Sequence, residues 1–377
     1  MVRPDPTSPW SEAFHGLREA GSMMRRLPEK LAARSRVRLL TISDDPQPRV
    51  NYGRTHLTST GHPIGGEIKL IHLRKAFPEA IDEFNLIYLV SSALPPHAEE
   101  LVDVAKKRGA KLVWNQNGVA YPGFYGDSYP WFNRRLAALR SRADYIVNQS
   151  EFSRISAERY LGASEVPSEI LFNPVDTSLF APAQDPLPPG PWRLLAAGTS
   201  HALYRTKSAL DTLRVLLSRG HDVRLAIAGE FRWSGAGSQV RDALRGLGEN
   251  VSILPPFRQA EAPAIYRNAH LLLHTKYNDP CPTVPIEAMA CGLPVVGTSS
   301  GGMGELVSET CGVLVPVAQG WTRDVPGNPE LLADGVERVM TARGIMAGEA
   351  RARAEKMFDV HPWISRHAMI LKEVLCR

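Results

Sequence analysis

The sequence predicts an α/β protein with two doubly wound parallel-sheet domains, and three observations support this prediction. Short runs rich in apolar and β-branched residues alternate with helical patterns, which is typical of parallel strands joined by helices. A proline-rich stretch divides the alternation into two sets. The length of 377 residues suits two domains better than a single core.

The first set of strands lies before the proline-rich stretch. These strands are expected at residues 36–43, 49–53, 86–90, 111–115, 145–148 and 169–172. A glycine-rich turn containing Gly65 and Gly66 precedes a helical pattern over 68–77. Because such a turn exposes backbone N–H groups at the positive end of a helix, it can serve as an anion site.

The second set follows the proline-rich stretch. Strands are expected at residues 193–197, 223–228, 251–254, 271–274, 294–296 and 312–315, with helices between them at 207–219, 239–247, 263–268 and 329–341. The strands are largely apolar runs, so both faces of each sheet are expected to be covered by helices.

The domain boundaries follow from composition. Residues 181–191 hold five prolines, which exclude a helix or a central strand. We therefore expect an N-terminal domain at 36–182, a linker at 183–191, a C-terminal domain at 192–355, and a helix at 356–377 that can pack back on the N-terminal domain. Residues 1–35 have the pattern of a basic helical extension that either packs on the first domain or makes peripheral contact with an anionic membrane surface.

Composition also excludes several classes of protein. Apolar residues make up 44% and charged residues 22%, as in folded globular chains. No run approaches the roughly 20 apolar residues of a membrane span, and the N-terminus lacks the apolar core of a secretory signal. The net charge of +5 is not gathered into aromatic-interleaved clusters, so no nucleic-acid partner is expected. The four cysteines show neither zinc nor disulfide spacing, which favours the cytoplasm.

Two carboxylates bracket a helix start after the strand expected at 271–274. Asp279 lies in the loop at the carboxyl end of that strand, where open α/β sheets bind ligands. Pro285 fits the first turn of a helix, and Glu287 is expected in the same turn. The backbone N–H groups of Cys281, Thr283 and Val284 can then face an anion. This arrangement suits a ligand that is both hydroxylated and phosphorylated.

The stretch from Asp279 onward resembles the E-x7-E signature of the family-4 glycosyltransferases (GT4), in a D-P-C-P variant followed by A-M-A-C-G-L-P-V-V. Further segments resemble that family in order: the glycine pair at 65–66, A-D-Y-I-V-N-Q-S-E-F at 143–152, N-P-V-D-T-S-L-F at 173–180 and G-G-M-G-E-L-V at 301–307. The resemblance implies the GT-B fold, in which two Rossmann-like domains face each other across a cleft.

The chain departs from the family pattern at four places. Asp279 stands where the family usually has Glu, and Pro282 where it usually has Gly. The Arg of the family's G-R-L segment is missing, and Thr199 occupies its position. A histidine of the N-terminal domain is also absent, with Asn117 as its expected substitute.

The resemblance implies a retaining, metal-independent glycosyltransferase of the hexosyltransferase type. Its donor would be a UDP- or GDP-linked sugar and its acceptor a glycan, lipid-linked or small molecule in glycoconjugate or polysaccharide biosynthesis, with no obligatory cofactor. Asp279 would bind donor sugar hydroxyls and Glu287 the ribose, while Arg205, Lys207 or both would neutralise the diphosphate. The full set of expected site residues is Asp279, Glu287, Arg205 and Lys207 for catalysis; Gly65, Gly66, Gly198, Thr199, Phe257, Arg258, Cys281, Thr283 and Val284 for donor binding; and Asn117 and Asn115 for the acceptor or sugar side.

A protein of another class remains open as the alternative. A non-catalytic nucleotide-sugar-binding protein of the GT-B fold would fit the missing Arg at Thr199 and the altered loop after Asp279. Such a protein would bind the nucleotide without transferring the sugar.

Overall fold

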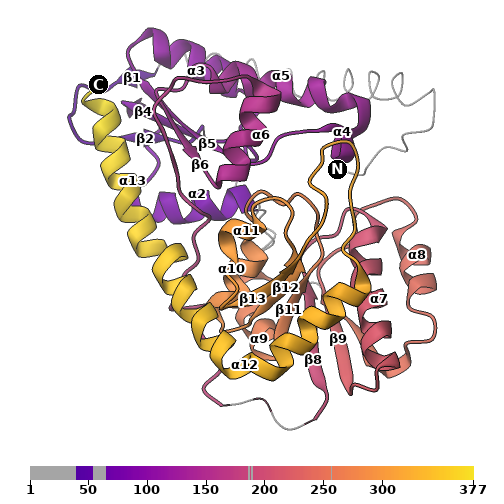
Figure 1. Cartoon of the computed structure of the whole chain (residues 1–377). Coiled ribbons are helices and arrows are strands. Elements are labelled where there is room, and N and C mark those ends of the chain that lie inside the picture. The colour runs from indigo at the N-terminus through magenta and orange to yellow at the C-terminus, as the bar shows by residue number, and fades with distance from the viewer. Residues whose placement is uncertain (1–39, 54–64, 186, 188–189, 256) are drawn as a thin grey trace. The chain divides into compact units, whose positions relative to one another are not determined.

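The computed structural model describes residues 40–53, 65–185, 187, 190–255 and 257–377 (Figure 1). The extension expected at 1–35 lies outside the described residues. The described chain forms two compact units. The N-terminal unit contains the residues up to Gln149, Ser153–Leu171 and Pro362–Arg377, and the C-terminal unit contains Ser150–Phe152 and Phe172–His361.

The N-terminal unit is built on a five-stranded parallel sheet in the order β2-β4-β5-β6-β7. Its strands are β2 (Val50–Asn51), β4 (Leu86–Val90), β5 (Lys111–Gln116), β6 (Tyr145–Asn148) and β7 (Ser168–Ile170). A separate parallel pair, β1 (Thr41–Ile42) and β3 (Glu83–Phe84), precedes the long strands. The pair member β3 was not expected, because two residues leave no periodic pattern.

Helices cover both faces of this sheet. They are α2 (Gly65–Ala76), α3 (Ala98–Lys107), α4 (Pro122–Tyr125), η1 (Gly126–Ser128), α5 (Tyr129–Arg140), α6 (Glu151–Leu161) and α13 (Val360–Leu375). Apolar residues of α2 and α13 pack together against one face, and those of α3 and α5 against the other. The last helix of the chain, α13, thus completes the core of the N-terminal unit, with Trp363, Ile370 and Leu371 buried beside Val50 and Tyr88.

The C-terminal unit has a six-stranded parallel sheet in the order β10-β9-β8-β11-β12-β13. Its strands are β8 (Trp192–Ala197), β9 (Val223–Ala228), β10 (Val251–Leu254), β11 (Leu271–His274), β12 (Val295–Thr298) and β13 (Gly312–Val315). Counted from β8 this is the order 3-2-1-4-5-6 of dinucleotide-binding Rossmann sheets, so the chain reverses direction across the sheet between β8 and β11. Ligands bind at such a switch point, beyond the carboxyl ends of the strands.

The helices of this unit are α7 (Leu203–Ser218), α8 (Ala236–Ala243), η2 (Gly248–Asn250), η3 (Gln259–Glu261), α9 (Ala262–Arg267), α10 (Thr283–Ala290), α11 (Met303–Leu306) and α12 (Pro329–Phe358). Apolar residues of α7 and of the first half of α12 pack against one face of the sheet, and those of α9, α10, α11 and the end of α12 against the other. The sheet is therefore doubly wound, as predicted.

Most strand bounds agree with the expectation. Six strands, β4, β6, β9, β10, β11 and β13, are confirmed residue for residue. The helix expected at 329–341 is wrong in length, because α12 continues to Phe358. Ala350, Ala354 and Phe358 recur every four residues and are buried, so packing extends the helix beyond its first amphipathic segment.

The change of unit comes at Phe172, ahead of the linker expected at 183–191. Asn173 and Val175 hold this segment in the C-terminal unit. The Asn173 side chain donates to the Cys281 carbonyl at 2.6 Å, and Val175 N donates to Phe358 O at 2.8 Å.

Within the part of the chain that the structure describes, no helix has both the length and the hydropathy to cross a bilayer.

Candidate active site

Two glycines lie at the carboxyl edge of the C-terminal sheet, directly after the neighbouring strands β8 and β9. Gly198 follows β8 with φ +94°, and Gly229 follows β9 with φ +132°. A Cβ atom on Gly229 would lie 2.7 Å from the Gly198 carbonyl oxygen. Only glycine permits this backbone approach at positive φ, so these two positions cannot carry a side chain without strain.

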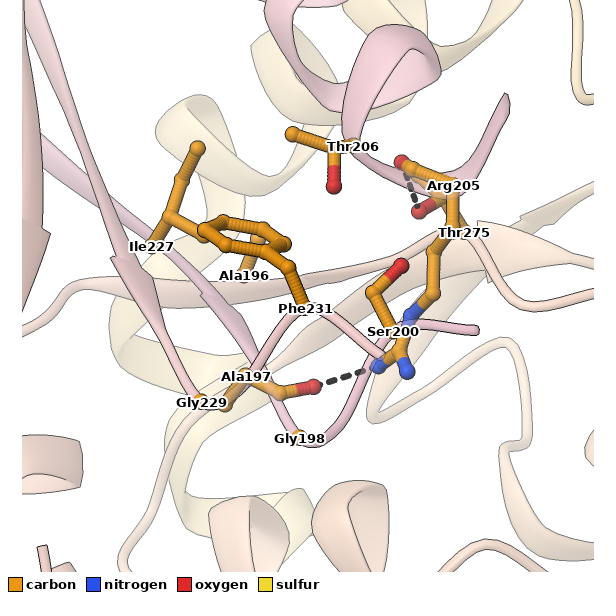
Figure 2. A pocket seen from close by; sticks show the side chains of 10 residues that line it. All are labelled: Ala196, Ala197, Gly198, Ser200, Arg205, Thr206, Ile227, Gly229, Phe231 and Thr275. Atoms are coloured by element: carbon orange, nitrogen blue, oxygen red, sulfur yellow. Dashed lines mark hydrogen bonds between the residues drawn. The ribbon is translucent and has the colours of Figure 1, made fainter. Parts of the chain in front are cut away.

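A small pocket lies at this edge, lined by residues of β8, β9 and the first turn of α7, with Thr275 after β11 (Figure 2). Arg205 extends from α7 into it. Its guanidinium donates to the Thr199 carbonyl at 2.7 Å and to the Ala197 carbonyl. Burial lowers the pKa of Arg205 and the Asp279 carboxylate opposes this, and an arginine remains charged in either case. The pocket therefore carries a fixed cation.

Asp279 is buried in the loop after β11, with 9% of its surface exposed. Its carboxylate forms an ion pair with Lys276, Nζ to Oδ2 2.7 Å. Burial by itself raises the pKa of Asp279, but Lys276, through its charge and its hydrogen bond, and the charge of Arg205 outweigh burial and hold that pKa below its ordinary value. Asp279 is thus an anion in the fold, available to accept hydrogen bonds.

Two hydrogen bonds fix the loop that carries Lys276. The Thr275 hydroxyl donates to the Arg205 carbonyl at 2.7 Å, and the Tyr277 backbone N–H donates to the Tyr204 hydroxyl at 3.1 Å. Both acceptors belong to the first turn of α7. Lys276 lies between these two anchored residues, so its backbone is held beside the start of the helix that bears Arg205.

The glycine pair of the G-G-M-G-E-L-V segment supports the same loop from the other side. Cβ atoms on Gly301 and Gly302 would lie well inside van der Waals contact of the Asp279 and Pro280 carbonyl oxygens. Gly302 N donates to Asp279 O at 2.9 Å. The two motifs therefore pack backbone to backbone, which explains why glycines stand at both positions.

His274 ends β11 next to this cluster. It is 2% exposed, and neither ring nitrogen has a hydrogen-bond partner. Burial lowers its pKa to about 3, with Arg205 adding to the effect, so the imidazole is neutral. Buried polar groups are normally satisfied. An unsatisfied imidazole beside Arg205 and Asp279 is therefore consistent with a polar ligand or water at this position.

The start of α10 faces the same edge. The helix begins at Thr283, so the N–H groups of Thr283 and Val284 have no acceptor within the helix. A Cβ atom on Gly198 would lie 3.2 Å from Val284 Cγ2, which places this start against the turn after β8. The Cys281 thiol instead accepts a hydrogen bond from Asn173 N at 3.3 Å, so its side chain serves packing.

Glu287 lies in the second turn of α10, and the expectation of the first turn is wrong because the helix already begins at Thr283. Its carboxylate accepts from Gln259 Nε2 and from the Tyr266 hydroxyl, each at 2.7 Å. Burial raises the pKa of Glu287, and the hydrogen bonds from Tyr266 and Gln259 oppose this. The carboxylate is thus held rigidly by two neutral donors.

Two of the expected donor-binding residues, Phe257 and Arg258, directly precede Gln259, which bonds to Glu287. Phe257 is half-buried and packs against the core beneath α10. Arg258 is exposed, and both its backbone N–H and its guanidinium donate to Glu261, at 2.7 and 2.9 Å, which caps the following turn. The next residue is Gln259, the partner of Glu287. The segment therefore runs directly past that carboxylate.

The N-terminal unit has its own polar cluster, at the carboxyl edge of its sheet. The buried Lys69 ammonium donates to Asn115 Oδ1 at 2.7 Å, Asn117 Oδ1 at 2.6 Å and Gln149 Oε1 at 3.3 Å. Asn117 Nδ2 in turn donates to the Ser92 hydroxyl at 2.6 Å. The structure thus brings the two expected asparagines together, with their carbonyl oxygens directed at a lysine.

Gly66 belongs to this cluster and Gly65 does not. A Cβ atom on Gly66 would clash with the Ser92 hydroxyl and lie 3.2 Å from Val90 Cγ1, whereas one on Gly65 would meet nothing within 4 Å. Gly66 therefore allows α2 to approach the loop after β4, where Ser92 orients Asn117.

The structure does not bring Lys207 to the pocket. Its ammonium pairs with Asp211 at 2.5 Å on the same helix, and 58% of the side chain is exposed. Sequence reasoning missed Lys276 and Lys69. Lys276 stands three residues before Asp279, a signal that could have been used. Among the described residues, no three His, Cys, Asp or Glu side chains gather where they could hold a metal ion.

The two parallel-sheet units define a protein of the GT-B glycosyltransferase fold class. Residues 181–357 match the family model described as glycosyl transferases group 1, so this part of the chain is similar to the domain that the model describes.

Two relatives illustrate the sequence similarity. The D-inositol 3-phosphate glycosyltransferase of Salinispora tropica is 41% identical over 107 residues, which cover 27% of this chain and 21% of that protein. The protein of the same name from Mycobacteroides abscessus is 32% identical over 154 residues, covering 39% and 32%. The chain therefore matches only about a fifth and a third of the length of these two relatives.

Two solved structures illustrate the similarity of fold. Anabaena Alr3699/HepE in complex with UDP-glucose aligns with a TM-score of 0.67 and 18% identity, over 87% of this chain and 100% of that chain. Sucrose-phosphate synthase from Thermosynechococcus elongatus aligns with a TM-score of 0.62 and 17% identity, over 83% and 77%. At these identities the likeness shows the fold.

Proposed function

We propose that the protein is a retaining, metal-independent glycosyltransferase of the hexosyltransferase type. It moves a sugar from a UDP- or GDP-linked donor to a glycan, lipid-linked or small-molecule acceptor in glycoconjugate or polysaccharide biosynthesis, and we expect it to act in the cytoplasm. Peripheral membrane contact through residues 1–35 remains a separate hypothesis outside the described residues.

One observation carries the proposal: a fixed cation and two buried carboxylates belong to the segments that follow β8 and β11, the two strands at the switch point of a Rossmann-type sheet. Arg205 enters the pocket from α7, while Asp279 and Glu287 lie before and within α10. The start of α10 adds two backbone donors beside the turn at Gly198. Cations and amides suit a diphosphate, and carboxylates suit the hydroxyls of ribose and sugar.

The proposed chemistry depends on charge that develops during the reaction. Breaking the bond between sugar and phosphate leaves negative charge on the departing nucleoside diphosphate. Arg205 and the N–H groups at the start of α10 would stabilise that charge more strongly in the transition state than in the bound donor, which lowers the barrier. Asp279 would hold the sugar hydroxyls and Glu287 the ribose, so the donor is oriented before cleavage.

The ligands of the structural neighbours support a uridine nucleotide. Alr3699/HepE was solved with UDP and with UDP-glucose, and the pneumococcal O-GlcNAc transferase GtfA with UDP and GlcNAc. For the acceptor, the name of the sequence relatives makes an inositol phosphate a sensible first compound to assay.

The first test is a thermal-shift panel of UDP, GDP, ADP and their sugars, with and without a chelator. A ligand at a hundred times its Kd stabilises by about 2.7 kcal/mol, which raises the Tm of a domain of this size by about 5–10 °C. A shift that survives chelation supports the donor site. Transfer is then followed by nucleotide release, and retention by the anomeric configuration of the product. Absence of any shift would overturn the proposal, and binding without transfer under a broad acceptor set would favour the non-catalytic alternative.

A further inference from the structure

We propose that Lys276 is the second phosphate-binding cation of the donor site, acting beside Arg205 on the diphosphate of the nucleotide sugar. This inference rests on the proposed function and adds a residue to it. The sequence pattern points to Lys207 as the partner of Arg205, but the structure directs that lysine to Asp211 at the surface.

The backbone on both sides of Lys276 is tied to the helix that carries Arg205. Thr275 donates to the Arg205 carbonyl at 2.7 Å, and Tyr277 N donates to the Tyr204 hydroxyl at 3.1 Å. Because both neighbours are anchored to the first turn of α7, the position of Lys276 relative to Arg205 is set by hydrogen bonds. Thr275 itself lines the pocket that Arg205 enters (Figure 2).

Arg205 and Lys276 influence the ionisation of the same two neighbouring side chains, His274 and Asp279. Besides burial, which is the largest cause, Arg205 and Lys276 both lower the pKa of His274. The same two cations also lower the pKa of Asp279, with Lys276 the stronger. Lys276 and Arg205 therefore act on the same buried histidine and the same buried carboxylate, at the carboxyl edge of β11.

Both cations keep donors for a ligand. Arg205 has five N–H donors, and its bonds to the Ala197 and Thr199 carbonyls use two of them. The Lys276 ammonium has three donors, of which the bond to Asp279 uses one. The Lys276 side chain is one-third exposed, so it is not sealed in the core. Asp279 holds that ammonium in place, and phosphate oxygens can accept its remaining hydrogens.

The unsatisfied His274 imidazole is a second, independent observation at this place. Both of its ring nitrogens lack a partner although the residue is 2% exposed. A polar group arriving between Arg205 and Lys276 would have an imidazole within the same cluster to bond. The cluster thus combines two cations with an unused buried hydrogen-bonding group, which fits an oxyanion such as a phosphate.

The competing interpretation is that Lys276 only stabilises the loop through Asp279. Two substitutions separate these roles. Lys276→Gln keeps an N–H donor for Asp279 and removes the charge, whereas Lys276→Arg keeps the charge. Lys106→Gln is the matched control, because Lys106 forms a similar half-buried pair with Asp144, at 2.6 Å, in the N-terminal unit.

The experiment is calorimetric titration of the full chain with whichever of UDP, GDP or ADP the wild type binds, and in parallel with the corresponding nucleoside. Losing a charge-assisted hydrogen bond to phosphate corresponds to a rise in Kd of about 10- to 100-fold. We expect that rise for Lys276→Gln with the diphosphate but not with the nucleoside, near-wild-type affinity for Lys276→Arg, and no change for Lys106→Gln.

Two results would overturn the assignment of Lys276 while leaving the donor site intact. One is a wild-type Kd for the diphosphate in Lys276→Gln. The other is an equal loss of nucleoside and diphosphate affinity in that variant, with the Arg variant equally impaired, which would mark a structural role. If the wild type binds no nucleoside diphosphate at all, the proposed function itself fails and the inference falls with it.

Discussion

Replacing Glu287 by glutamine separates the structural role of this residue from its role in binding. The carboxylate accepts two hydrogen bonds of 2.7 Å, from Gln259 Nε2 and from the Tyr266 hydroxyl. In the Glu287→Gln variant, the carbonyl oxygen of the introduced amide can still accept from Tyr266. The new N–H₂ group would face Gln259, whose own amide can turn to present its oxygen. Both hydrogen bonds can therefore be remade between neutral groups.

The expected change in stability is small. Each remade bond loses its charge assistance, which costs about 1 kcal/mol. Burial raises the pKa of Glu287, which means that the ionised form is penalised in the fold, and the neutral amide avoids that penalty. These two effects oppose each other, so we expect the free energy of unfolding to change by no more than about 1 kcal/mol and the Tm by about 2–4 °C.

The expected change in function is much larger. A carboxylate bond to a ribose hydroxyl contributes about 1.5–3 kcal/mol, so its loss lowers kcat/KM by about two orders of magnitude. Because the ribose is held in both the bound donor and the transition state, the Kd for the nucleoside diphosphate should rise by a similar factor. The control is Glu337→Gln, which removes a carboxylate from the surface pairs with Arg219 and His221.

The assay is nucleotide release under initial-rate conditions, with Kd measured calorimetrically and Tm by differential scanning fluorimetry. Near-wild-type kcat/KM and Kd in a folded Glu287→Gln protein would refute the assignment of this carboxylate to the donor. A collapse of Tm alone would show instead that the hydrogen bonds to Gln259 and Tyr266 are needed chiefly for folding.

Three further predictions concern the clusters around the two sheet edges. Gly66→Ala should lower Tm and disturb the approach of α2 to Ser92, while Gly65→Ala, which meets open space, should leave Tm within error; equal Tm values would contradict the packing argument. Lys69→Met leaves three buried amide oxygens without their hydrogen-bond donor. The free energy of unfolding, measured by denaturant titration, should fall by about 2–4 kcal/mol, and a loss below about 1 kcal/mol would be inconsistent with this. His274 has its pKa lowered to about 3 by burial, so its neutral form stabilises the fold fully above the ordinary pKa of 6.5, and that contribution is lost as the pH falls toward 3. At about pH 4.5 the loss amounts to about 2–3 kcal/mol. A His274→Phe variant should therefore lose less Tm than the wild type between neutral and mildly acidic pH, and identical pH profiles would disprove it.

The strands were predictable because their signal is local. Buried parallel strands are short apolar runs. The runs L-I-Y-L-V at 86–90 and V-R-L-A-I-A at 223–228 can therefore be recognised as strands without knowing which strands they pair with. The positions of Asp279 and Glu287 relative to the strand at 271–274 are likewise a matter of spacing. The sequence could therefore locate the loop and helix that carry the two carboxylates.

Other features depended on contacts between distant segments. The extension of α12 to Phe358 follows from the burial of Ala350 and Ala354 against the sheet. The crossing between the two units comes at Phe172, before the prolines, because Asn173 bonds to Cys281, more than a hundred residues away in the sequence. No local pattern carries such information.

The two lysines, Lys207 and Lys276, show most clearly what the sequence determines and what depends on tertiary contacts. By itself the sequence placed cations near the strand ends, and Lys207 looked suitable because the family that the sequence resembles commonly has a basic pair in this segment. The tertiary structure directs Lys207 away from the pocket. Two residues along a helix point to different faces, so Lys207 turns toward Asp211 while Arg205 enters the pocket. Lys276 reaches the same edge because parallel strands end together there, although about seventy residues separate it from Arg205.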